Sequence, residues 1–261
     1  MTTFTAQILR FDSLPSTNVE AARRAVEGAP EGLCIVAAEQ TAGRGRLERH
    51  WVSPKHAGLY FSVILRPQMD QNVWPLLTLM AGIAVHDALL DSCGLATDIK
   101  WPNDILANSR KLCGILAETV ETPMGRAVVV GIGINLTNKS FPSELDQVAT
   151  SIEASTAETP NLESVLNALI RAFASQYQVL RQPTGSEEII ATWSAHSSYG
   201  TGKPIQVTDA NETFAGTTRG LERDGALRVE TDAGEIRIVR AGDVSSVRAS
   251  EAIAEPESIK L

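Results

Sequence analysis

Helical spacing of apolar residues appears in four stretches of the chain. Residues 73–94 are apolar on nearly every side at helical length, which predicts a buried helix that ends at Gly94. Near the N-terminus, we expect Thr17 and Glu20 to begin a helix as a capping box. This N-terminal helix covers 16–29, and two further predicted helices cover 161–180 and 186–196.

Shorter apolar runs, bounded by turn residues, predict strands. They cover 33–40, 59–67, 97–101, 111–120 and 126–136. The last two are joined by "ETPMG", a turn that contains Pro and Gly, so we expect them to form an antiparallel hairpin.

From Ser198 onward the pattern changes to short β-rich runs separated by "DANE", "ERDG" and "DAG". About five short strands in so few residues are typical of a small barrel. We therefore predict a catalytic domain, a small β domain and a polar tail at 1–197, 198–249 and 250–261.

Composition narrows the possible partners. The net charge of −8 argues against a broad basic surface for nucleic acid, and 43% hydrophobic residues predict a globular core. The sequence shows no leader and no run of about 18 apolar residues, so we expect a cytoplasmic protein with no membrane partner. Its three Cys and four His show neither a disulfide framework nor metal-ligand spacing.

An arginine-rich loop, "TAGRGRLERHW" at 41–51, interrupts this acidic chain. Gly43 and Gly45 give the backbone freedom, while Arg44, Arg46 and Arg49 concentrate positive charge. Such a loop can close over an anionic ligand and exclude water. The alternative is a solvated basic turn that contacts only the protein's own acids.

Two further motifs carry candidate polar groups. In "KWPND" (100–104), Asn103 and Asp104 follow the end of a predicted strand and could hold Mg²⁺, unless they serve only a turn. In "RKLCGIL" (110–116), Lys111 could neutralise charge, or lie along the protein surface as an edge-strand lysine. Strict alternation places Lys111 and Gly114 on opposite faces, so both can contact one ligand only if the strand has a bulge or a strong twist.

The run "VVVGIGINL" (128–136) has two unlike faces. One carries four aliphatic side chains, and the other carries Val129, Gly131, Gly133 and Asn135. Either something lies close against this bare face, or the glycines relieve crowding against a helix. No third glycine and no helix follow, so "GIG" is not a dinucleotide fingerprint.

A helix N-terminus at "STN" (16–18) adds free N–H groups that can bind an anion. Together, the mobile arginines, the lysine, the Asn-Asp pair and the glycine-lined strand suit the activation of a carboxylate by a nucleoside triphosphate. That reaction must neutralise phosphate charge and keep a mixed anhydride dry.

These motifs resemble the biotin–protein ligase family. "STN", "EQTAGRGR…W", "LYFSVILRP", "KWPNDI", "KLCGILAE" and "VVVGIGINL" stand in that family's order and spacing, densely over about residues 10–140. The resemblance implies an α+β fold: a catalytic domain like class II aminoacyl-tRNA synthetases, with a mixed sheet flanked by helices, and a small SH3-like C-terminal domain. It implies that biotin and ATP form biotinyl-AMP, with Mg²⁺, and that a lysine of a biotin carboxyl carrier protein then accepts the biotin.

The resemblance also implies roles for individual residues. Its catalytic residues correspond to Lys111, Arg44 and Arg46, and Asp104 is the candidate magnesium ligand. The implied biotin-binding residues are Ser16, Thr17, Asn18, Gln40, Gly43, Arg44, Arg46, Trp51, Lys111, Gly114 and Gly131. The implied ATP-binding residues are Arg46, Arg49, Trp51, Asn103, Asp104, Lys111 and Asn135.

The sequence departs from the family in two places. Glu48 stands where the family's loop usually carries glycine, which adds negative charge and removes backbone freedom. Some relatives carry an N-terminal helix-turn-helix and act as repressors, whereas "STN" begins here at Ser16. We therefore expect a ligase that is not a repressor and binds no specific DNA.

Other interpretations remain open at this point. A lipoate or octanoate ligase shares the implied fold, although the arginine loop and "KWPND" favour biotin. A nucleic-acid-binding module and a non-catalytic biotin-binding protein are the alternatives from other classes. We also expect a homodimer, in which the apolar strand at 126–136 pairs edge to edge with the same strand of a second copy.

Overall fold

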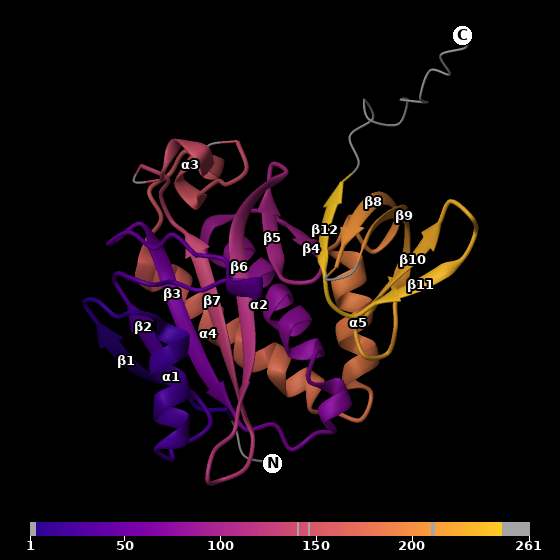
Figure 1. The fold of residues 1–261 in the computed structure, drawn as a ribbon. Helices are drawn as coiled ribbons and strands as arrows, with labels where there is room; N and C mark the ends of the chain where they lie inside the picture. The colour runs from indigo at the N-terminus through magenta and orange to yellow at the C-terminus, as the bar shows by residue number, and fades with distance from the viewer. Residues whose placement is uncertain (1–3, 140, 146, 210–211, 247–261) are drawn as a thin grey trace.

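The computed structural model describes residues 4–139, 141–145, 147–209 and 212–246. A seven-stranded sheet forms most of the molecule, in the order β1-β2-β3-β7-β6-β5-β4 (Figure 1). β1 and β2 are parallel and the other neighbouring strands are antiparallel, so the sheet is mixed, as the resemblance implied. The strands are β1 (Gln7–Phe11), β2 (Leu33–Ala37), β3 (Gly58–Leu65), β4 (Asp98–Lys100), β5 (Asp104–Ala107), β6 (Arg110–Val120) and β7 (Ala127–Asn135).

Helices cover both faces of this sheet. α1 packs on one face, where its Ala21 and Ala25 join the inward side chains of Ile35 and Val129 in a small core. α2, α4 and α5 pack on the other face and form a larger core with Val130, Ile132 and further strand residues. The helices are α1 (Thr17–Val26), α2 (Leu76–Cys93), α3 (Ile152–Thr156), α4 (Leu162–Leu180) and α5 (Gly185–Ala195). Short 3₁₀ turns lie at η1 (Arg46–Glu48), η2 (Gln71–Val73) and η3 (Ser143–Leu145).

The predicted buried helix is confirmed as α2. Gly94 ends it with a left-handed φ of 61°, as expected for a C-terminal glycine. By length and a mean hydropathy of 1.4 this helix could cross a membrane, yet 67% of that stretch is buried inside the protein. Packing against α4, α5 and the sheet explains its apolar composition.

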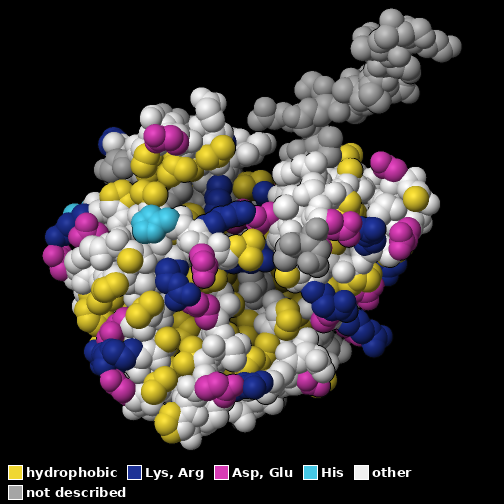
Figure 2. All heavy atoms as spheres, viewed as in Figure 1, with side chains coloured by type: hydrophobic (Ala, Val, Ile, Leu, Met, Phe, Trp, Pro, Cys, Tyr) yellow, Lys and Arg dark blue, Asp and Glu magenta, His cyan; other side chains and the backbone are white. Residues whose placement is uncertain are grey.

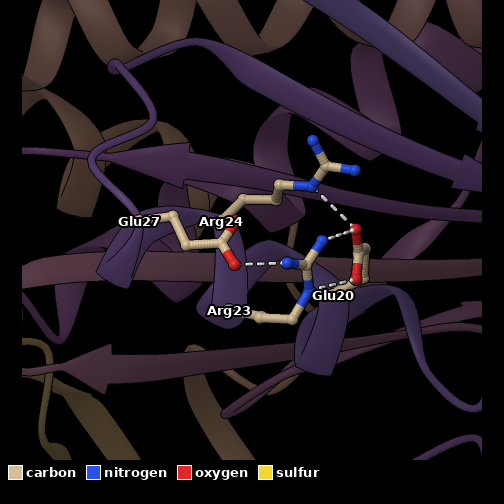
Figure 3. Close-up of polar contacts among 4 residues, drawn as sticks. All are labelled: Glu20, Arg23, Arg24 and Glu27. Carbon is tan, nitrogen blue, oxygen red and sulfur yellow. Dashed lines mark hydrogen bonds and ion pairs between the residues drawn. The ribbon is translucent and has the colours of Figure 1, made fainter.

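The capping box predicted at the start of α1 is wrong. Ser16 is the N-cap residue and makes no side-chain capping bond, while Thr17 is already helical. Glu20 instead accepts hydrogen bonds from Arg23 and Arg24, one turn further along (Figure 3). The bond from Arg23 is the main cause that lowers the pKa of Glu20 to about 2.

The hairpin of β6 and β7 is confirmed, but the expected edge pairing of the second strand is wrong. β7 lies in the middle of the sheet, with β3 on one side and β6 on the other. Its backbone groups are therefore used within the chain, and this strand offers no edge to a second copy. The sequence patterns also missed β1, β5 and α3.

The C-terminal residues form a second sheet of five strands, as predicted, in the order β11-β10-β9-β8-β12. Its strands are β8 (Thr201–Thr208), β9 (Thr213–Leu221), β10 (Leu227–Thr231), β11 (Ile236–Val239) and β12 (Asp243–Ser246). The buried indole of Trp101 donates to the Gly225 carbonyl at 3.0 Å, which ties this sheet to the turn after β4. The predicted tail at 250–261 lies outside the described residues.

Candidate active site

A cavity of about 280 Å³ opens on the α1 face of the large sheet, between the sheet, the arginine loop and the start of β12. In Figure 2 the surface is hollowed between the large sheet and the C-terminal strands, with Lys and Arg side chains beside the hollow. Every residue implied by the resemblance lines the cavity except Gly43. Gly43 is buried beneath it, where a Cβ would lie 2.4 Å from the Trp51 carbonyl oxygen.

The bare face of β7 forms the floor of the cavity. A Cβ at Gly131 would lie 2.1 Å from Asn18 Oδ1, and one at Gly133 would lie 2.5 Å from Trp51 Nε1. Both readings of this face hold in part: Gly131 makes room for a side chain of helix α1, and Gly133 makes room for Trp51 of the loop. The buried Nε1 of Trp51 has no hydrogen-bond partner among the described residues.

Polar side chains join at one end of the floor. Gln40 Oε1 accepts from the Thr17 backbone N–H at 2.8 Å and from its hydroxyl at 3.1 Å. Gln40 Nε2 in turn donates to the Ser53 hydroxyl at 2.9 Å. Ser62 Oγ, fully buried in β3, lies 2.7 Å from Thr17 Oγ1 and from Asn18 Oδ1. The Thr17 hydroxyl therefore bonds to side chains at the cavity and does not cap its helix.

Lys111 reaches the cavity because β6 carries a bulge. Ile105 pairs with Cys113 and Leu106 with Lys111, which leaves Leu112 as the extra residue. A Cβ on Gly114 would then lie 3.3 Å from Lys111 Cε, so both residues face the same space, as the conditional prediction required. Lys111 Nζ lies 2.6 Å from Asp104 Oδ1 and 5.4 Å from the centroid of the Trp51 ring.

Each arginine of the loop has its own polar partner. Arg44 Nη2 lies 2.7 Å from Glu118 Oε1 of β6. Arg46 Nη1 donates to Asn103 Oδ1 and to the Gly242 carbonyl, both at 3.3 Å, and burial lowers its pKa. Arg49 forms an ion pair with Asp243 of β12. The loop is therefore fastened to the sheet, to the turn before β5 and to the C-terminal strands.

The tip of the loop has an unusual backbone. Leu47 has a φ of 53° and Glu48 a φ of 59°, the left-handed region that favours glycine. Both side chains are exposed. The residue that departs from the family pattern thus occupies a backbone conformation that glycine adopts without strain.

The two asparagines implied to bind ATP, Asn103 and Asn135, both donate hydrogen bonds to backbone carbonyls. Asn103 Nδ2 donates to the Ile115 carbonyl at 2.8 Å, and Asn135 Nδ2 donates to the Thr150 carbonyl at 2.9 Å. Within the described ranges, no three His, Cys, Asp or Glu residues gather as a metal site. Burial raises the pKa of the Cys113 thiol, which fits the predicted role of a small core residue.

Sequence reasoning missed several residues of the cavity. Ser62 and Glu118 do not line the cavity but contact side chains that do, and the sequence shows them as a serine within an apolar strand and as the acid that follows "KLCGILA". Asp243 had no local signal, because folding alone brings the C-terminal strands to the loop. Other missed residues include Phe141, Leu145 and Val148, which line the cavity from the segment after β7.

Comparison with known proteins now identifies the class. The model of the biotin/lipoate A/B protein ligase family matches residues 8–135, and that of the biotin protein ligase C-terminal domain matches residues 200–246. The chain belongs to this family of ligases, and it is an enzyme.

Individual relatives narrow the class to biotin–protein ligases. The bifunctional ligase/repressor BirA of Bacillus subtilis is 37% identical over 90% of this chain and 72% of its own length. The biotin–[acetyl-CoA-carboxylase] ligase of Paracoccus denitrificans is 35% identical, over 88% of this chain and 96% of its own. A biotin protein ligase from Aquifex aeolicus, solved with biotin and ATP, superposes with a TM-score of 0.81 at 26% identity, covering 93% and 99% of the two chains.

Proposed function

We propose that the protein joins biotin to a carrier protein in two steps. A carboxylate oxygen of biotin attacks the α-phosphorus of ATP, which forms biotinyl-5′-AMP and releases pyrophosphate. The amine of a lysine on a biotin carboxyl carrier protein then attacks the carbonyl carbon of the anhydride, which releases AMP and a proton.

The Lys111–Asp104 pair, 2.6 Å apart in the same cavity as the Thr17–Gln40 pair, carries this proposal. One end of the cavity offers neutral donors and acceptors for an uncharged polar group of biotin. The other end offers a cation where the carboxylate meets the phosphate. The apolar face of Trp51 lies between them, above Gly133.

The charged side chains act on the developing negative charge. Lys111 lies beside the point where charge builds up on the attacked phosphate, and Asp104 orients its ammonium group. Arg44 and Arg46 close over biotin and the anhydride, so the loop keeps the intermediate from water. Arg49 reaches toward the outer phosphates of ATP.

Magnesium fits one of these positions. Two carboxylates line the cavity within the described part of the chain: Asp243 is paired with Arg49, and Asp104 is paired with Lys111, the cation proposed to face the phosphate. Magnesium bound with ATP takes most of its ligands from phosphates and water, so one carboxylate suffices. Asp104 is the residue that would hold the ion, which would neutralise phosphate charge.

The direct test incubates the protein with ATP, Mg²⁺, biotin and an apo carrier domain. The mass of the carrier should rise by one biotinyl group, and a carrier whose acceptor lysine is changed to arginine should stay unmodified. Lipoate in place of biotin separates the two branches of the family. Incorporation of lipoate and not biotin would overturn the proposal.

We further propose that the protein binds no specific DNA. The net charge of −8 supports this, because tight binding to a duplex draws on many phosphate contacts. A mobility-shift assay with DNA upstream of biotin-synthesis genes, at two salt concentrations, should show no sequence-selective complex. A selective complex that biotin strengthens would identify a repressor instead.

A further inference from the structure

Glu118 joins the arginine loop to the floor of the cavity. Its Oε1 lies 2.7 Å from Arg44 Nη2, and its Oε2 accepts from Asn18 Nδ2 at 2.8 Å. The residue stands on β6, four positions beyond Gly114, and its side chain is 29% exposed. One carboxylate therefore bridges a loop and a helix start that are far apart in the sequence.

Asn18 continues this connection into the biotin end of the cavity. Its Nδ2 also donates to the Leu116 carbonyl at 3.2 Å, and its Oδ1 lies 2.7 Å from Ser62 Oγ. Ser62 contacts Thr17, and Thr17 contacts Gln40. Polar contacts thus run without a break from Arg44, through Glu118, to the proposed site of the polar group of biotin.

The side chains at the two ends of this series of contacts differ in how freely they can move. Asn18 is buried and confined by Gly131, which leaves no room for even a Cβ beside it. The Arg44 side chain, by contrast, is 51% exposed on a loop held by ion pairs. Exposed ion pairs are weak enough to break and reform, so the Arg44 end of the chain is the one that moves.

We propose that Glu118 is a positioning residue that holds Arg44 over the biotin site and so sets how the loop closes. This rests on the proposed function, because it assigns Arg44 to closure over biotin. Glu118 acts through Arg44 and does not touch the reacting atoms. Without its charge, Asn18 keeps the Leu116 and Ser62 contacts, whereas Arg44 loses its anchor.

The test compares Glu118→Gln with Glu121→Gln. Glu121 stands three residues further on, is 72% exposed and pairs with Arg126, outside the residues that line the cavity. In biotin-dependent pyrophosphate exchange, Glu118→Gln should raise the KM for biotin about threefold to fivefold, the upper part of the range for loss of an exposed ion pair. The KM for ATP and the kcat should change less, and Glu121→Gln should match the wild type.

A second measurement follows the loop itself. Trypsin cleavage after Arg46 and Arg49, followed by mass spectrometry, should be several times faster in Glu118→Gln than in Glu121→Gln, and biotin should slow it less. This assay needs no catalysis. If the wild type shows no pyrophosphate exchange, that result counts against the proposed function. The cleavage rates still test whether Glu118 anchors Arg44.

A double-variant comparison separates positioning from a structural role. If Glu118 acts through Arg44, Glu118→Gln should add no further change in cleavage or in KM to an Arg44→Gln variant. An effect of equal size in both backgrounds would show that Glu118 supports the floor through Asn18, and would overturn the proposal. Cleavage and KM unchanged in Glu118→Gln would overturn it as well. If Glu118→Gln melts early, Arg44→Gln alone should still speed cleavage.

Discussion

The floor of the cavity and the arginine loop both line the cavity, but they are held in place by different kinds of contact. The floor is a central β-strand, where Gly131 and Gly133 leave room that Asn18 and Trp51 fill, and beside it the buried hydroxyls of Thr17 and Ser62 have hydrogen-bond partners. The loop is exposed, and ion pairs and hydrogen bonds from its arginines hold it to three separate elements. The shape of the cavity and one fixed cation, Lys111 of β6, are therefore built into the sheet, while the arginines are supplied by a segment that can move.

The largest expected effect comes from Lys111 at the edge of the floor. Lys111→Ala should slow biotin-dependent pyrophosphate exchange about a hundredfold to a thousandfold, because a preorganised cation beside the transferred phosphate is lost. Circular dichroism should show an intact fold. Lys55→Ala removes an exposed lysine that pairs with Asp12, and it serves as the control. Normal exchange in a well-folded Lys111→Ala protein would remove Lys111 from the mechanism.

A pair of glycine substitutions compares the two regions directly. Gly131→Ala forces a Cβ against Asn18, and overpacking of this kind costs about 1–3 kcal/mol of unfolding free energy. Gly45→Ala in the loop meets its nearest atom at 3.4 Å and should be close to neutral. Urea denaturation measures the stability, and calorimetry with biotin should show weaker binding for Gly131→Ala. Equal costs at both positions would contradict a rigid floor beside a yielding loop.

A smaller effect is expected at the tip of the loop. Glu48→Gly should raise the unfolding free energy by about 0.5–1 kcal/mol, because the left-handed strain of about 1–2 kcal/mol outweighs the greater backbone entropy of unfolded glycine. Glu48→Ala removes the same charge and keeps the Cβ, so it should not share the gain. Thermal melts of the two variants distinguish the effect of backbone strain from the effect of charge. An equal gain in both would assign the effect to charge.

Salt should produce the smallest difference. Raising ionic strength from about 0.05 to 0.5 M screens exposed ion pairs, each worth about 0.2–1 kcal/mol. Amide hydrogen exchange should speed up a few-fold at residues 43–50 and stay unchanged in β7. Parallel changes in both segments would mean that the loop opens only when the sheet does.

Much of the fold could be predicted because long apolar runs carry a strong signal. The buried helix α2, the β6–β7 hairpin and the five C-terminal strands were found from spacing and turn residues. β1 and β5 are short, and β1 alternates irregularly at the sheet edge, so neither stands out from its surroundings. The capping box failed because Gln40, which is distant in sequence, competes for Thr17.

The site shows where local patterns stop. Alternation is a strict rule in strands, so the sequence predicted the bare face of β7 and showed that Lys111 and Gly114 could face one ligand only through a bulge or a strong twist. The partners of the arginines were not predicted. Asp243 lies almost two hundred residues beyond Arg49, and only tertiary folding pairs them. Residue types indicated the chemistry, whereas the contacts that hold the loop follow from the complete fold.

The hydrogen bond from Trp101 to Gly225 bears on how far this enzyme can be divided into exchangeable modules. The indole is buried, and apolar side chains of β8 and β10 belong to the same continuous core as α2 and α4. Transplanting the C-terminal strands from a distant relative would alter that core and, through Asp243, the anchor of Arg49. The two segments therefore have to evolve together, and a chimera should fail at their shared core before it fails at the chemistry.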